Sequence, residues 1–244
     1  MYDFAAMDAL SWNLLATAAA LGVIHTIAGP DHWVPFIVLG RARRWSRPRT
    51  LAVTLACGVG HVGSSVVLGF LTLWLGWEAT RLAGIEAVRG DLAAWGLVAF
   101  GAAYGLWGVR KALRDRAGIE PHEHAGHTHI HVRGVDRHAH DALEQARLVR
   151  RQTTFWSLFV IFVLGPCEPM IPLFVLPLAR GDLGLAAITA GVFSAATLLT
   201  MAVAVLLVLA GVERIRLAGL EKWSHAVAGG AVAFCGFAIL FLGL

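Results

Sequence analysis

Charged residues are scarce in this sequence. Asp, Glu, Lys and Arg make up 15% of its 244 residues, against roughly 25% in soluble domains, and they are absent from long stretches of it. Hydrophobic residues make up 57%. Because a helix crosses the ~30 Å hydrocarbon core of a bilayer with about 20 residues, the chain has room for several crossings. These features exclude an ordinary soluble domain and predict an all-α membrane protein embedded in the lipid bilayer.

Cysteine is also rare, and the N-terminus has no basic segment. The three cysteines, Cys57, Cys167 and Cys235, lie in apolar surroundings and are too few for a disulfide framework. The first apolar run is preceded by Asp3 and Asp8 instead of basic residues, which favours a retained helix over a signal peptide. The net charge is +4, but no basic patch interleaved with aromatic residues accompanies it, so nucleic acid is not an expected partner.

Six apolar blocks remain between the charged segments, and they predict six transmembrane helices. They cover residues 10–39, 51–77, 92–109, 155–178, 183–211 and 223–244. Of the 20 basic residues, 17 lie in the segments 41–49, 110–151 and 212–222, whereas the opposite side receives only Arg81, Arg89 and Arg180. Basic loops stay in the cytoplasm. We therefore expect a multi-pass protein of a bacterial cytoplasmic (inner) membrane, with both termini outside and the central loop inside.

Two of the blocks contain sequences that break helices. The first holds Gly29-Pro30 and the fourth holds Gly165-Pro166, and proline interrupts the interior of a helix. Unpaired backbone at membrane depth is tolerated only inside protein or beside a wet cavity. The two Gly-Pro pairs are 136 residues apart. A second pair of similar segments, residues 96–100 and 230–234, is 134 residues apart.

The matching offsets indicate a duplicated unit of three helices. Because the number of helices in the unit is odd, the second copy is inverted. We expect a first repeat over residues 1–109, a loop over 110–152 and a second repeat over 153–244, with helices 1 and 4 broken at Gly-Pro. Broken helices at equivalent positions of inverted repeats mark the midplane site of a transporter.

Residues able to bind a metal ion gather at these breaks. His25 and His32 are seven residues apart, on one face of a regular helix, and Asp31 lies beside them. Imidazole and carboxylate groups suit a borderline divalent ion such as Ni²⁺, Co²⁺ or Zn²⁺. Three further candidates are His61, which stands among glycines in the second block, and Cys167 and Glu168, which occupy the equivalent positions of the second break.

Structural interpretations of the same residues remain open. Asp31 can cap the turn after Pro30, the histidines can donate to backbone carbonyls, and Cys167 can be an inert packing residue. Ionisable groups inside membrane spans are costly, so a functional interpretation is the default.

The central loop is rich in histidine. Seven of the eleven histidines lie within it: His122, His124, His127, His129, His131, His138 and His140. Tracts of this kind bind metals, and this alternation favours a flexible multidentate chelator that captures metal ions at the cytoplasmic mouth. The alternative is a polar linker of biased composition.

Three of these segments resemble motifs of the nickel/cobalt transporter family, particularly its urease-accessory-type nickel permeases. Residues 22–32 are similar to the first-helix signature of that family, residues 58–61 to its second-helix motif and residues 164–169 to its fourth-helix motif. The resemblance implies that His25, Asp31, His32 and His61 handle Ni²⁺ or Co²⁺ as transported substrate. From the two broken helices we expect alternating access at the His/Asp site of helix 1, and a cytoplasmic metal chaperone is a candidate partner. Uptake and efflux both occur in the family.

Two other functions compete with transport. A transmembrane thiol–disulfide electron shuttle would use Cys167, but such a protein needs a cysteine at each break, and the first break carries Asp31. An intramembrane serine protease would pair Ser194 with His225, although Ser194 lacks the glycine-flanked setting of such a nucleophile. We therefore expect a transporter without enzymatic activity and without a resident cofactor.

Overall fold

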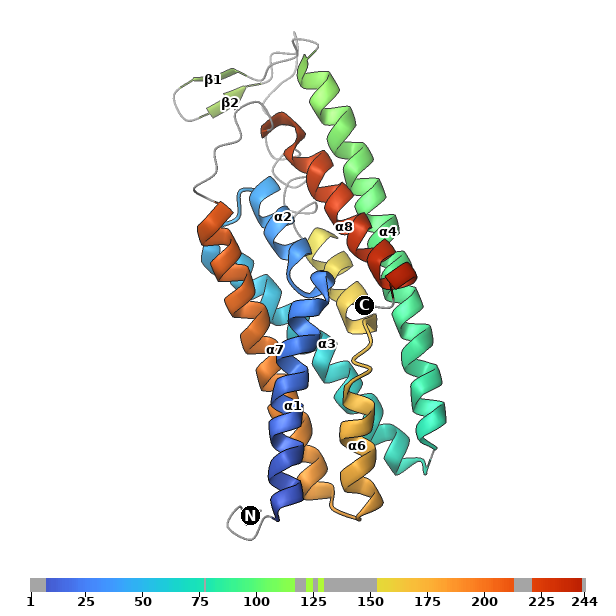
Figure 1. Ribbon diagram of the computed structural model, residues 1–244. Coiled ribbons are helices and arrows are strands. Elements are labelled where there is room, and N and C mark those ends of the chain that lie inside the picture. The colour runs from blue at the N-terminus through green and yellow to red at the C-terminus, as the bar shows by residue number, and fades with distance from the viewer. Residues whose placement is uncertain are drawn as a thin grey trace.

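A computed structural model describes residues 8–76, 78–116, 122–124, 127–129, 153–212 and 221–242. These residues form a helical bundle (Figure 1). Its helices are α1 (Ala9–Ala28), α2 (Val34–Ala42), α3 (Arg47–Trp74), α4 (Ala79–Arg116), Thr153–Leu164, α6 (Met170–Ala179), α7 (Leu183–Val212) and α8 (Ser224–Leu242). Single 3-10 turns cover Pro30–His32 and Glu221–Trp223.

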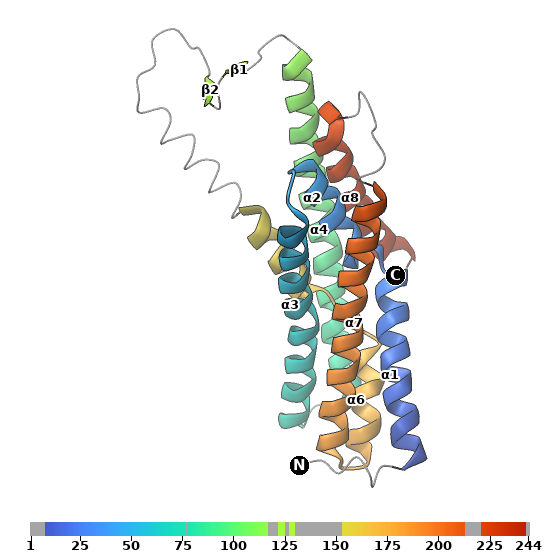
Figure 2. The same cartoon turned by 90° about the vertical axis from the view of Figure 1, so that its left-hand side faces the viewer.

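Five helices in the described part of the chain are long and apolar enough to cross a membrane, namely α1, α3, α4, α7 and α8. The fourth predicted crossing consists of two shorter helices in series, Thr153–Leu164 and α6. Figures 1 and 2 show that α1, α4 and α7 run in one direction along the bundle, whereas α3, α6 and α8 run in the other.

Both helix breaks lie at the Gly-Pro pairs that the sequence singled out. Helix α1 ends at Ala28, the 3-10 turn begins at Pro30, and α2 continues from Val34. The second interruption lies between Leu164 and Met170 and contains Pro166 and Pro169. Proline has no N–H to donate and its ring clashes with the preceding turn, so neither helix continues through its break.

Aspartates cap two of the long helices. Asp8 precedes α1 and accepts hydrogen bonds from the backbone N–H and the hydroxyl of Ser11, at 2.8 and 2.6 Å. These bonds hold the pKa of Asp8 below its ordinary value. Asp182 accepts from the backbone N–H of Leu185 in the first turn of α7. Such caps satisfy the donors that a helix start leaves unpaired.

The third predicted helix begins earlier than the sequence indicated. Helix α4 starts at Ala79 instead of residue 92 and has 38 residues. Arg81 and Arg89, which were expected between two helices, therefore lie within one, and the predicted start of this helix was wrong. Charges at Arg81, Glu86 and Arg89 concealed the helix because they lower local hydropathy. The ion pair between Glu86 and Arg89, one helical turn apart, explains how these charges are accommodated.

The histidine-rich loop contains two short strands. Strand β1 (His122–His124) pairs antiparallel with β2 (His127–His129), with His122 opposite His129 and His124 opposite His127. The sequence predicted no regular structure there. The other predicted loop ligands, His131, His138 and His140, lie outside the described residues.

Helices α4 and α8 pack closely along stripes of small residues. Gly101, Gly105 and Gly108 of α4 face Ala226, Gly229 and Ala233 of α8. Small residues let the backbones of membrane helices approach each other. At Gly229 an added Cβ would overlap the backbone of Gly105, whereas a Cβ at the neighbouring Gly230 would meet open space.

The Gly229→Ala variant is therefore expected to be less stable than the wild type by at least the 1–3 kcal/mol that is typical of overpacking. Gly230→Ala is the matched control, and it should be neutral or slightly stabilising because alanine favours a helix. Thermal unfolding in detergent can be followed with a thiol-reactive fluorophore, since Cys57, Cys167 and Cys235 are all buried. Equal midpoints for the two variants would contradict the close packing of α4 on α8.

Candidate metal centre

Four side chains with metal-binding atoms converge where the two breaks meet α3. His25 lies in the last turn of α1 and His32 ends the 3-10 turn of the first break. His61 lies at the middle of α3, and Cys167 lies in the second break. The breaks thus bring residues from both halves of the chain to one point.

The distances within this cluster are short. The Nε2 atoms of His32 and His61 are 3.3 Å apart, and the sulfur of Cys167 is 3.0 Å from Nε2 of His61. The rings of His25 and His32 have centroids 4.6 Å apart. Three ligand atoms, one each from His25, His61 and Cys167, lie within 4.8 Å of one another. These three residues could hold one ion, and His32 adjoins them through its contact with His61.

The two central imidazoles are oriented by backbone carbonyls. Nδ1 of His32 is 3.2 Å from the carbonyl oxygen of Gly29, and Nδ1 of His61 is 3.3 Å from that of Phe162. A carbonyl only accepts, so each Nδ1 carries a proton and donates. The two Nε2 atoms lie within hydrogen-bond distance of each other, at 3.3 Å, and in a neutral ring this atom carries the lone pair that binds a metal ion. A cation between them would be bound by both atoms, and hydrogen bonding of the second nitrogen is usual for metal-bound histidine.

Three of the four side chains of the cluster are buried, and His25 is half-buried. His32 and His61 are each 2% exposed, and Cys167 is fully buried. The His25 ring faces Phe193, and the His61 ring faces Phe162. Nε2 of His25 is buried and has no hydrogen-bond partner among the described residues. An unpaired buried nitrogen is costly, and a bound metal ion would satisfy it.

The two predicted carboxylates have different positions. Asp31 lies 3.2 Å from Nδ1 of His32, so it touches the side of that ring that faces away from His61. In this place Asp31 orients His32 and adds negative charge to the site. Glu168 is exposed, unlike the adjacent Cys167, and the described contacts of the cluster do not include its side chain.

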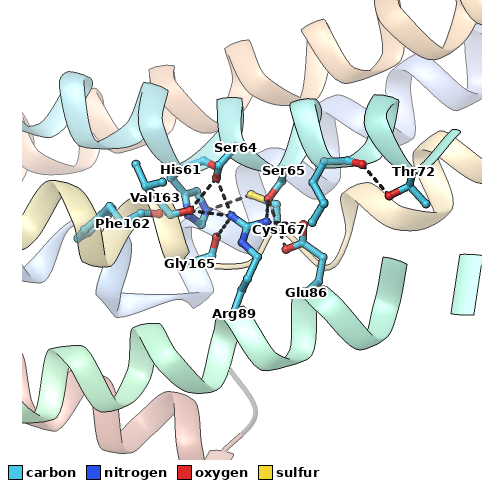
Figure 3. A network of polar contacts seen from close by, with 11 residues as sticks. His61, Ser64, Ser65, Thr72, Glu86, Arg89, Phe162, Val163, Gly165 and Cys167 are labelled. Atoms are coloured by element: carbon cyan, nitrogen blue, oxygen red, sulfur yellow. Dashed lines mark hydrogen bonds and ion pairs between the residues drawn. The ribbon is translucent and has the colours of Figure 1, made fainter. Parts of the chain in front are cut away.

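A buried carboxylate that the sequence did not single out lies beside the second break. Glu86 of α4 is 1% exposed and forms an ion pair of 2.6 Å with Arg89. Figure 3 shows this pair next to Ser64 and Ser65 of α3 and beside Cys167. The signal in the sequence was a Glu and an Arg three residues apart next to an apolar block, but that pattern is common on exposed helices.

The residues that a serine protease or a thiol–disulfide electron shuttle would use have neighbours that do not suit those functions. The Nδ1 of His225 lies 2.7 Å from the hydroxyl of Tyr104, and its ring packs against Trp107, an arrangement that does not favour a nucleophile–base pair with Ser194. The three cysteines are free and buried. The break that contains Cys167 faces histidines and no second thiol within the described residues.

Comparison of the chain with protein-family models, with curated proteins and with solved structures finds no match. The class of the protein therefore follows from its own fold and site. It is a helical protein with several long apolar helices, typical of a membrane protein, and with a buried His/Cys cluster at two helix breaks.

Proposed function

We propose that this protein transports divalent transition-metal ions, most simply Ni²⁺ or Co²⁺, across a bacterial cytoplasmic membrane by alternating access. The observation that carries the proposal is the convergence of His25, His32, His61 and Cys167 at the two breaks. Three imidazoles and a thiolate suit a borderline ion such as Ni²⁺, Co²⁺ or Zn²⁺. The proposal assigns the protein no catalytic step and no resident cofactor.

The proposal includes six crossings in two inverted repeats, and the packing supports it. Under that symmetry, helices 1, 2 and 3 correspond to helices 4, 5 and 6. Gly22 of the first helix abuts Phe193 of the fifth, and Gly60 of the second abuts Val163 of the fourth. The third and sixth, α4 and α8, pack against each other. The contact of helices 1 and 5 thus corresponds to that of helices 2 and 4.

In the proposed mechanism the histidines and the thiolate replace part of the water shell of the ion. Each break divides a crossing into two half-helices that end at the site. Movement of one half-helix pair can open the site to one side of the membrane while the other pair keeps it closed. Such gating at the interface of two repeats is the usual basis of alternating access.

The decisive experiment measures radioactive metal flux into proteoliposomes that contain the purified full-length protein. Ni²⁺, Co²⁺, Zn²⁺ and Fe²⁺ are compared with and without a pH gradient, and protein-free liposomes serve as the blank. We expect saturable flux of Ni²⁺ or Co²⁺. The absence of protein-dependent flux for all four ions would refute the proposal.

The proposed orientation can be tested by labelling. Single cysteines introduced at Asp3 and in the loop 110–152 should react with a membrane-impermeant maleimide from opposite sides, with Asp3→Cys reacting in intact cells. Placing Arg89 within α4 leaves the 17 basic residues of segments 41–49, 110–151 and 212–222 unaffected, so the expected orientation is unchanged. The native cysteines are buried and should give little background. Reaction of both sites in intact cells would contradict the orientation.

The histidine-rich loop is proposed to capture metal ions without forming part of the pathway. Several weak sites at the cytoplasmic mouth raise the effective concentration of the ion there. Deletion of residues 122–140 should therefore raise the half-saturating metal concentration on the cytoplasmic side, with little change in maximal flux. Replacement by a Gly/Ser linker of equal length controls for shortening. Loss of flux at saturating metal in correctly inserted protein would place the loop in the pathway.

A further inference from the structure

Arg89 of α4 connects three parts of the molecule that meet beside the metal centre (Figure 3). One guanidinium nitrogen, Nη1, donates to Glu86 at 2.6 Å. The other, Nη2, donates to the hydroxyl of Ser64 at 2.6 Å and to the carbonyl oxygen of Val163 at 2.7 Å. It also lies 3.3 Å from the carbonyl oxygen of Gly165. A single side chain therefore links α4, α3 and the second break.

Arg89 reaches two carbonyls at the point where the helix Thr153–Leu164 ends. A helical carbonyl normally accepts from the N–H four residues later. For Gly165 that residue is Pro169, which has no N–H to donate. For Phe162 it is Pro166, and this carbonyl accepts from the N–H of Gly165 at 3.0 Å and also lies 3.3 Å from Nδ1 of His61. Arg89 thus supplies donors to the carbonyls of Val163 and Gly165 at the end of this helix, where Pro169 supplies none to Gly165.

Ser64 tightens the same connection. Its hydroxyl lies 2.8 Å from the carbonyl oxygen of Val163 and 2.8 Å from that of His61. The turn of α3 that carries His61 is thereby tied to the segment that leads into the break. Cys167 follows this anchored segment by two residues, and its sulfur is 3.0 Å from Nε2 of His61.

We propose that Arg89 is a positioning residue that holds the second break so that the Cys167 thiolate completes the coordination of the metal ion. Glu86 supplies the counter-charge that keeps the guanidinium in place at low exposure. Because soft thiolate ligands favour some metals over others, Arg89 would thereby influence which ions the site accepts. This inference rests on the proposed metal centre.

A lysine is not equivalent at this position. The guanidinium is a rigid fork that donates in several fixed directions, whereas the ammonium of lysine is a compact point charge. Lys in place of Arg89 can keep the charge interaction with Glu86, but it cannot at the same time donate hydrogen bonds to Ser64 and to the two carbonyls. Arg89→Lys is therefore expected to loosen the break while the charge balance stays unchanged.

The test uses the full-length protein in detergent with Co²⁺ as the probe. Wild-type protein should show the sulfur-to-cobalt charge-transfer absorption of a thiolate ligand, together with the ligand-field bands of bound Co²⁺. Arg89→Lys should keep the ligand-field bands, lose the sulfur absorption and bind Co²⁺ roughly tenfold more weakly, a typical effect of losing an outer partner of a metal ligand. Arg180→Gln, which removes an arginine from an exposed pair with Asp8, is the matched control and should resemble the wild type.

A double-mutant comparison distinguishes positioning from general support of the fold. If Arg89 acts through Cys167, Arg89→Lys should weaken Co²⁺ binding in the wild type but cause no further weakening in the Cys167→Ser variant. A merely structural role would weaken binding in both. Undiminished sulfur absorption in Arg89→Lys would overturn the proposal.

Two further outcomes also decide the matter. Wild-type protein that binds Co²⁺ without sulfur absorption would overturn the role of Arg89 but leave the proposed transport function standing, whereas wild-type protein that binds no Co²⁺ would contradict both. If Arg89→Lys does not accumulate, Ser64→Ala replaces it as a nearly isosteric change at the same link. It should lower the sulfur absorption, and unchanged absorption would again overturn the proposal.

Discussion

His32→Ala and His61→Ala are each expected to abolish metal flux while the protein remains in the membrane. Each variant removes one of the two Nε2 atoms that face each other at 3.3 Å, and with it a ligand that the proposal assigns to the ion. Loss of an outer partner costs about 10- to 100-fold in metal affinity, so loss of a ligand should exceed that range. Flux into proteoliposomes at a fixed metal concentration measures the effect.

The control for these variants is His225→Ala, which removes a histidine that pairs with Tyr104 on α4 instead of joining the cluster. It should keep most of the flux. Flux near the wild-type level in His32→Ala would mean that the first break is only structural.

Asp31→Asn should have a smaller effect than either histidine variant, because Asp31 contacts the far nitrogen of His32. We expect flux to fall by roughly 10- to 100-fold. Adding Cys167→Ser to this comparison also tests the electron-shuttle alternative. If Cys167→Ser is inactive while Asp31→Asn is tolerated, the thiol and not the proposed metal site carries the function.

Gly165→Ala is expected to eliminate metal binding with only a moderate loss of stability. A Cβ at this position would lie 2.8 Å from Nδ1 of His61 and 3.2 Å from the carbonyl oxygen of Phe162. The added methyl group would therefore push the His61 ring away from the carbonyl that orients it. Overpacking of this kind typically costs 1–3 kcal/mol, whereas misplacing a central ligand should remove binding altogether.

Gly63→Ala is the matched control because Gly63 lies on α3 two residues from His61 and a Cβ there meets nothing within 4 Å. Co²⁺ titration of both purified variants, with thermal unfolding of each, separates binding from stability. Wild-type affinity in Gly165→Ala would mean that the position of the His61 ring does not matter for binding. Equal loss of Co²⁺ binding in Gly63→Ala would contradict the packing around His61, because a methyl group at residue 63 should touch nothing.

Several features were predictable because they depend on local chemistry. Proline cannot donate a hydrogen bond in any context, so Pro30 and Pro166 marked both breaks without any knowledge of the fold. Long apolar runs likewise marked the long apolar helices, and α3 and α7 lie close to where the sequence placed them. The start of α4 was missed because the pairing that makes buried charges tolerable leaves no mark on hydropathy.

The candidate site was likewise predictable only in part. The sequence by itself determined which chemically suitable residues stand at the breaks, including His25, His32 and Cys167. Only the tertiary structure decided that Cys167 meets His61, 106 residues away along the chain, that Asp31 orients an imidazole, and that Glu168 is exposed. Composition and helical periodicity describe one segment at a time, whereas these outcomes depend on how α3 and α4 pack against a break in another segment. Such packing depends on hydrogen bonds to carbonyls, on ion pairs and on close contacts at glycines. These interactions form only when the helices come together.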